Sequence, residues 1–168
     1  MTAQRTQEVS TPPRIVIRTF WALHRAAYRI TGGRFGVTRA KAGQRFGMMR
    51  ITTVGRRSGQ RRVAMIGYYP DGENLVTLAM NGWGKGEPAW WLNLQAHPET
   101  TVDLPDGPRQ VRARKATDAE RARLWPTFRD YPGWGDDIDA LSARRPGETA
   151  VVVFEPSNRA ASGKAVAA

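Results

Sequence analysis

Three β-rich runs, separated by two short turns, lie between residues 47 and 80 and constrain the fold most. Val, Ile, Thr and Tyr recur in these runs, and glycine-containing segments at 55–60 and 70–72 separate them. Turns this short allow only antiparallel neighbours, so the pattern predicts a meander with strands at 48–54, 62–69 and 74–80. The pattern argues against a doubly wound sheet, because parallel strands need long helical crossovers.

The rest of the chain adds a hairpin, a last strand and short helices. A hairpin is predicted over Pro105-Asp106-Gly107, with strands at 100–104 and 110–115, and a fully apolar strand follows at 149–154. Short helices are predicted at 88–96 and 136–144, and the capping box of residues 117–120 predicts a helix over 118–128. The predicted fold is mainly β with helical insertions (α+β): a barrel of about six mostly antiparallel strands.

An amphipathic helix is predicted at residues 12–30, before the barrel. Pro12 and Pro13 lie at its start and Gly32-Gly33 at its end, with arginines opposite a narrow apolar stripe. The stripe packs on the barrel or, alternatively, lies on an anionic membrane surface. The predicted organisation is a disordered arm at 1–11, this helix and a basic loop at 12–46, a barrel domain at 47–156 and a disordered tail at 157–168.

Positive charge is concentrated in the first third of the chain. Residues 1–62 hold 14 Lys and Arg but one acid, whereas the remainder holds 12 Lys and Arg and 14 acids. This excess indicates a polyanionic partner, such as nucleic acid, an anionic membrane or a polyanionic cofactor, or else a solvated arginine-rich surface. With no Cys and two His, no metal site is expected. The sequence shows no secretory signal, so we expect a cytoplasmic protein, with peripheral attachment to the inner face of the membrane as an alternative.

The densest cationic segment is the turn that joins the first two predicted strands. Gly55 and Gly59 free the backbone there, and Ser58 adds a hydroxyl group to four arginines within seven positions: Arg56, Arg57, Arg61 and Arg62. Backbone N–H groups and guanidinium forks together suit phosphate or several carboxylates. A solvated turn is the alternative. Nucleic-acid binding is disfavoured, because no aromatic side chain alternates with these arginines.

Aromatic residues mark two further candidate sites. Trp90 and Trp91 begin the helix at 88–96, where adjacent residues cannot both face one side of a core. One is expected in the core while the other stacks on a ring or walls a pocket, and the alternative is that both pack. Tyr131 and Trp134 lie on a Pro-Gly loop, where aromatics wall a ligand site or, alternatively, cover the end of the barrel.

Four segments together resemble a known family: 28–33, 52–59, 88–98 and 116–121. Over residues 28–156 the chain resembles the deazaflavin (coenzyme F420)-dependent nitroreductase family of split β-barrel oxidoreductases. The resemblance implies an F420H2-dependent reductase that transfers a hydride to a small organic acceptor: an enone, a quinone or a nitro compound. Two alternatives are an FMN-binding split-barrel oxidoreductase and an F420-binding carrier without turnover.

The resemblance also implies the residues of the site. The basic turn would hold the phosphate and glutamate tail of F420, while the following strand, the end of the third strand and the short helix would surround the deazaflavin ring. Tyr131 and Trp134 would position the substrate. In this family Ser-Lys often stands where this chain has Met80-Asn81, and Trp134 and Asp137 replace tyrosines tied to nitroimidazole substrates. The implied cofactor-binding residues are Arg56, Arg57, Ser58, Arg62, Val63, Ala64, Met65, Ile66, Gly67, Leu78, Ala79, Met80, Asn81, Ala89, Trp90, Trp91, Leu92 and Asn93.

Overall fold

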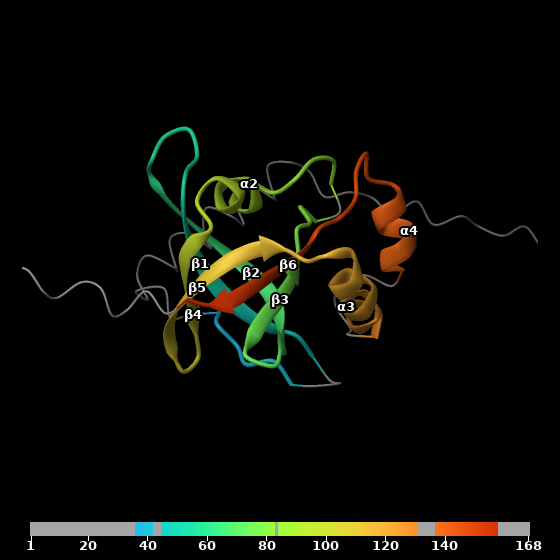
Figure 1. Cartoon of the computed structure of the whole chain (residues 1–168), viewed down its shortest axis with the longest axis horizontal. Coiled ribbons are helices and arrows are strands. Elements are labelled where there is room, and N and C mark those ends of the chain that lie inside the picture. Colours follow the sequence, from blue (N-terminus) through green and yellow to red (C-terminus); the bar gives the residue numbers. More distant parts are fainter. Residues whose placement is uncertain (1–35, 42–44, 83, 131–136, 158–168) are drawn as a thin grey trace, which may run out of the picture. The chain divides into compact units, whose positions relative to one another are not determined.

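A computed structural model describes residues 36–41, 45–82, 84–130 and 137–157 of the chain (Figure 1). The predicted arm at 1–11 and the predicted helix at 12–30 lie outside these residues, as do Tyr131 and Trp134. Ser157, which the sequence places at the start of the tail, donates its backbone N–H to the carbonyl of Gln110 at 3.0 Å.

Six strands form a closed barrel in the order β1-β2-β3-β6-β5-β4, and all neighbouring strands pair antiparallel. The predicted fold class is therefore confirmed. β2 continues two residues past its predicted end, β3 ends two residues early, and β6 begins two residues late. The strands are β1 (Gly47–Val54), β2 (Arg61–Asp71), β3 (Asn74–Leu78), β4 (Glu99–Leu104), β5 (Gly107–Lys115) and β6 (Val151–Pro156).

β1 closes the barrel, because it pairs along both of its edges. Its whole length faces β2, from Gly47 opposite Tyr68 to Val54 opposite Arg61. Its centre also faces β4, where Arg50 lies opposite Asp103 and its Nε donates to the Asp103 carboxylate. The outer face of this seam therefore carries an ion pair, while its inner face is apolar.

The barrel side chains form two buried clusters on opposite faces of β6. Val152 and Phe154 belong to the interior cluster with Met49 and Ile51, whereas Val151 and Val153 pack in a second cluster. Successive residues of a strand point to opposite faces, so a strand covered on both sides has to be apolar throughout. The second cluster contains Leu124, Trp125 and Phe128 of α3, which explains the uninterrupted apolar sequence of this last strand.

Three helices complete the described part of the chain: α2 (Ala89–Ala96), α3 (Asp118–Asp130) and α4 (Ile138–Ala143). Figure 1 shows α2 over one end of the barrel and α3 and α4 together on another side. The predicted capping box is confirmed, because the Thr117 N–H donates to Glu120 Oε2 at 2.8 Å and the Glu120 N–H donates to Thr117 Oγ1 at 3.3 Å. None of the helices in the described residues is long and apolar enough to cross a membrane.

Arg114 fastens α3 to the barrel. Its Nη1 and Nη2 each donate to Glu120 at 2.7 Å, and its Nε donates to Glu155 of β6 at 2.7 Å. The hydrogen bonds from Arg114, assisted by the Thr117 N–H, lower the pKa of Glu120 from 4.5 to about 2. A carboxylate whose pKa is lowered by folding stabilises the protein above its unfolded pKa, and this contribution is lost as the pH falls toward the folded pKa.

Glu120→Gln should remove this pH-dependent contribution. We expect the variant to lose about 1–2 kcal/mol of unfolding free energy at pH 7, allowing for partial solvent screening, and progressively less between pH 5 and pH 2. Urea titrations across this pH range measure the difference. Glu73→Gln, on the exposed turn after β2, is the control. An equal loss at pH 7 and pH 2.5 would contradict the role assigned to the Glu120 carboxylate.

Candidate functional site

The turn between β1 and β2 is a compact backbone loop that depends on two glycines. The Gly55 N–H donates to the Gln60 carbonyl and the Gly59 N–H donates to the Gly55 carbonyl, both at 2.8 Å. A Cβ on Gly55 would lie 2.8 Å from Ser58 Oγ, and Gly59 has a φ of +66°, which other residues rarely adopt. Glycine is therefore favoured by the backbone conformation at 59, whereas a side chain at 55 would require Ser58 to shift.

This turn presents its cations to solvent. Arg56, Arg57, Arg61 and Arg62 are all exposed, as is Ser58. None of the ion pairs between described residues includes any of these four arginines. All four guanidinium groups therefore face solvent, and Arg62 Nη2 donates to Gln60 Oε1 at 3.1 Å.

A buried amide on α2 holds the turn in place. Asn93, 5% exposed, accepts from the Arg56 backbone N–H at 3.1 Å and donates to Thr53 Oγ1 at 3.1 Å. The Thr53 hydroxyl in turn donates to the Arg62 carbonyl at 3.5 Å. Asn93 therefore links the helix to both arms of the basic turn, and its side chain is occupied by protein groups.

The segment of β2 from Val63 to Gly67 does not present one continuous face. Residues directly opposite in an antiparallel pair share a face, and Ala64 and Ile66 lie opposite Ile51 and Met49. Both side chains accordingly pack against the interior cluster. Val63, 49% exposed, and the half-buried Met65 lie on the other face. Only alternate side chains of this predicted group can meet one ligand, although the whole backbone can.

The predicted site residues at the end of β3 and the start of α2 also include both buried and more exposed side chains. Leu78 and Ala79 are buried, Met80 is half-buried, and Asn81 is exposed. On α2, Ala89 is exposed, Trp90 and Leu92 are half-buried, and Trp91 is 2% exposed in the interior cluster. The two indole rings lie 6.3 Å apart at 60°. Trp91 is a core residue, and the half-buried Trp90 packs against the same interior cluster.

The sequence predicts Asn93 as a ligand but not as a link, and it assigns no role in the site to Thr53. A polar residue among the apolar residues of WWLNLQA was the available signal for Asn93, because a buried amide needs partners. No local pattern marks the bond from Asn93 to Thr53, because the two residues lie 40 positions apart.

The donor set fits a polyanion. A closed antiparallel barrel carries an exposed arginine turn that is fixed by a buried amide and has no ion-pair partner in the described part of the chain, an arrangement that suits an anionic group. The profile of the F420H(2)-dependent quinone reductase family matches residues 21–155, and the chain belongs to this family. This assignment confirms the predicted relationship to deazaflavin-dependent oxidoreductases, and with it coenzyme F420 as the cofactor.

Two Mycobacterium tuberculosis proteins illustrate the relationship. One, provisionally named as an F420H(2)-dependent quinone reductase, is 40% identical over 72 residues, which are 42% of this chain and 60% of that protein. Another, named F420H(2)-dependent quinone reductase, is 32% identical over 107 residues, covering 61% of this chain and 68% of that protein. The chain therefore matches about two thirds of the length of these relatives.

Solved structures share the fold. One, described as a domain-swapped dimer, has a TM-score of 0.57 at 19% identity and covers 82% of this chain and 99% of its own. An F420-H2 dependent reductase has a TM-score of 0.55 at 22% identity and covers 64% of this chain and 93% of its own. At these identities the likeness supports the split-barrel fold.

Asn93→Ala should loosen the basic turn. The change removes the donor to Thr53 Oγ1 and the acceptor of the Arg56 N–H, so we expect a loss of about 1–3 kcal/mol in unfolding free energy. Backbone amides of residues 55–60 should exchange faster with solvent than in the parent. Asn81→Ala, at an exposed position outside this network, is the matched control. Unchanged exchange of the Arg56 amide in Asn93→Ala would contradict the link.

Proposed function

We propose that this chain is an F420H2-dependent reductase whose acceptor is a quinone. The sequence analysis left three acceptor classes open: enones, quinones and nitro compounds. The relatives that match over 107 residues bear names that specify quinone reduction, and this favours the quinone among them. Enone and nitro acceptors serve as comparison substrates in the test.

The basic turn is the observation that carries the proposal. F420 has a phosphate and a glutamate tail, and both are ligands that arginine forks bind well. Four exposed arginines without ion-pair partners in the described residues, fixed by Asn93, give this tail a preformed anchor. We assign Arg56, Arg57, Ser58 and Arg62 to this anchor.

The remaining residues would shape a ring site next to the anchor. When bound, the reduced cofactor supplies the hydride, so the chain needs no nucleophile of its own. We assign the β2 backbone at 63–67 and the chain at 78–81 to the sides of the ring. Ala89 and the half-buried Trp90 of α2 would exclude water near it. Tyr131 and Trp134 are assigned to the acceptor from the sequence.

Titration of the purified protein with oxidised F420 and, separately, with FMN tests the cofactor. F420 should bind and FMN should bind far more weakly. Mixing the protein with F420H2 and a soluble quinone should then restore the visible absorbance of the oxidised cofactor, faster than with an enone or a nitroaromatic. Preferential reduction of either comparison substrate would overturn the quinone assignment, and binding without any turnover would indicate a carrier.

Arg57→Ala and Arg62→Ala should each weaken F420 binding by about 1.5–3 kcal/mol, because each removes a charge-assisted hydrogen bond. The loss should shrink for a cofactor analogue without phosphate and glutamates. Arg109→Ala, on the hairpin between β4 and β5, changes the net charge equally and controls for a general electrostatic effect. Equal weakening in all three variants would point to net charge rather than to the turn.

Tyr131→Phe should lower kcat and leave the affinity for F420 unchanged, if the phenol donates a proton or a hydrogen bond to the acceptor. Steady-state kinetics with the quinone and a separate F420 titration distinguish the two effects. Tyr69→Phe is not a suitable comparison, because its hydroxyl is bonded to the Leu124 carbonyl. Unchanged kcat in Tyr131→Phe would make solvent the proton source.

A further inference from the structure

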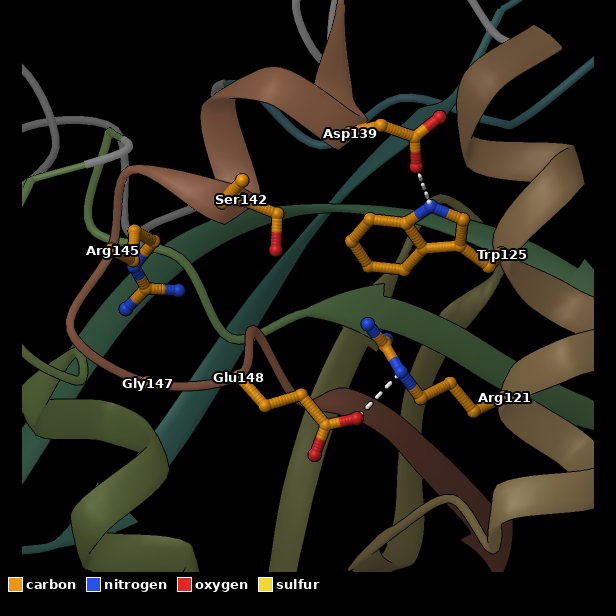
Figure 2. Close-up of a pocket in the computed structure, with 8 residues that line it drawn as sticks. Arg121, Trp125, Asp139, Ser142, Arg145, Gly147 and Glu148 are labelled. Carbon is orange, nitrogen blue, oxygen red and sulfur yellow. Dashed lines mark hydrogen bonds and ion pairs between the residues drawn. The ribbon is translucent and has the colours of Figure 1, made fainter.

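A hollow of about 400 Å³ lies away from the basic turn, between α3, α4 and residues 145–148 (Figure 2). Two arginines line it. Arg121 comes from α3, and Arg145 follows α4 on the opposite wall. The polar groups of the hollow are largely paired: Arg121 with Glu148 at 2.6 Å, and the Trp125 indole N–H with Asp139 at 2.6 Å. The two arginines differ in their partners: Arg121 forms an ion pair with Glu148, whereas Arg145 donates hydrogen bonds to backbone carbonyls outside the hollow.

Arg145 reaches out of this hollow to the connection between β3 and α2. Its Nη1 donates to the Ala79 carbonyl at 3.0 Å and to Thr149 Oγ1 at 2.8 Å. Its Nη2 donates to the Gly86 carbonyl at 2.7 Å. One guanidinium thus spans the connection, from the residue after β3 almost to the start of α2.

This connection has few other fixed points. It is rich in glycine, and Gly82 and Gly86 have φ values of +54° and +85°. Its other described backbone bonds include those from the Ala79 N–H to the Ala150 carbonyl at 2.8 Å, from the Met80 N–H to the Leu78 carbonyl at 2.9 Å and from the Gly84 N–H to the Asn81 carbonyl at 2.9 Å. Glycine-rich backbone loses much conformational entropy on ordering, so a charged clamp at both ends contributes strongly to its order.

The Arg145 side chain directs its hydrogen bonds to the connection through the two ends of its guanidinium group. Nη1 and Nη2 reach the two backbone carbonyls, whereas Nε has no partner among the described residues.

We infer that Arg145 is a positioning residue for F420 binding, which acts by clamping the connection between β3 and α2. The inference rests on the proposed function, in which residues 78–81 and the first turn of α2 flank the ring. Arg145 holds the carbonyl of Ala79, two residues before Asn81, and that of Gly86, four residues before Trp90. Asn93 then fixes α2 to the basic turn, so the two side chains together position α2 and the chain that leads into it.

Arg121 supplies a matched control. It lines the same hollow, and it also bonds to residue 149, by donating from Nη1 to the Thr149 carbonyl at 3.1 Å. Its guanidinium lies 4.1 Å from the centroid of the Trp125 ring. Within the described residues its partners belong to α3, Thr117 and residues 148–149, and none belongs to the connection. Loss of Arg121 should therefore destabilise the same region without releasing residues 79–86.

The experiment compares Arg145→Met, Arg145→Lys and Arg121→Met in the full-length protein. We expect both Met variants to lower Tm. Arg145→Met should raise the Kd for F420 about tenfold, because only about one molecule in ten would then hold the connection in its binding-competent conformation, while Arg121→Met should stay within about twofold of the parent. Arg145→Lys keeps the charge but lacks the planar fork, so it should fall between them. Amides of residues 79–86 should exchange faster in the Arg145 variants alone, without cofactor.

The outcomes separate this inference from the function on which it rests. Absence of F420 binding by the parent protein would overturn the proposed function, whereas faster exchange at 79–86 would still identify the clamp. If the parent binds F420 and Arg145→Met and Arg121→Met have the same Kd, the positioning role of Arg145 is wrong. If Arg145→Met does not fold, the same comparison is made between Arg145→Lys and Arg121→Lys.

Discussion

Closure of the barrel through β1 is the constraint on which the site depends. An antiparallel sheet of six strands leaves two edges, and pairing β1 with both β2 and β4 removes them. β1 and β2 remain paired as far as Val54 and Arg61, so the turn beyond them is carried by a ladder that cannot slip without breaking the closure. The basic turn therefore begins from a rigid base, even though its arginines are exposed.

The turn is also positioned by the hydrogen bond from the Arg56 N–H to the buried side chain of Asn93. Asn93 lies among the buried residues of α2, where an unpaired amide would be costly. Its two bonds to Thr53 and Arg56 remove that cost only when helix and turn are correctly docked. When α2 docks on the end of the barrel, these two bonds therefore also fix the backbone conformation of the turn. A purely apolar contact would hold the helix but would specify the turn less closely.

The sequence predicts the local parts of this structure better than their assembly. Strand and helix signals are local: the glycine turns before β2 and β3, the Thr117–Glu120 box and the apolar run of β6 each lie within a few residues, and each element appears close to its expected bounds. The pairing of β1 with β4 and the contact of Asn93 with Thr53 join residues about 40 to 50 positions apart. No local pattern encodes such a contact, which forms only when the barrel closes. The sequence alone could have predicted that only alternate side chains of β2 face one side, because successive residues of a strand point to opposite faces.

Arginines of the barrel and α3 and arginines of the basic turn differ in their partners. Arginines on the barrel and α3, such as Arg50, Arg114 and Arg123, have acidic partners. Those of the basic turn have none among the described residues, and four like charges within seven positions repel one another.

A fold that needed positive charge only for solubility would gain by dispersing these cations over its surface. Concentrating them on one exposed turn, next to a buried amide, leaves a local excess of positive charge. The turn supplies four of the 14 Lys and Arg in residues 1–62, a segment that holds one acid. The remaining two thirds are nearly balanced because acids there serve to fasten the barrel.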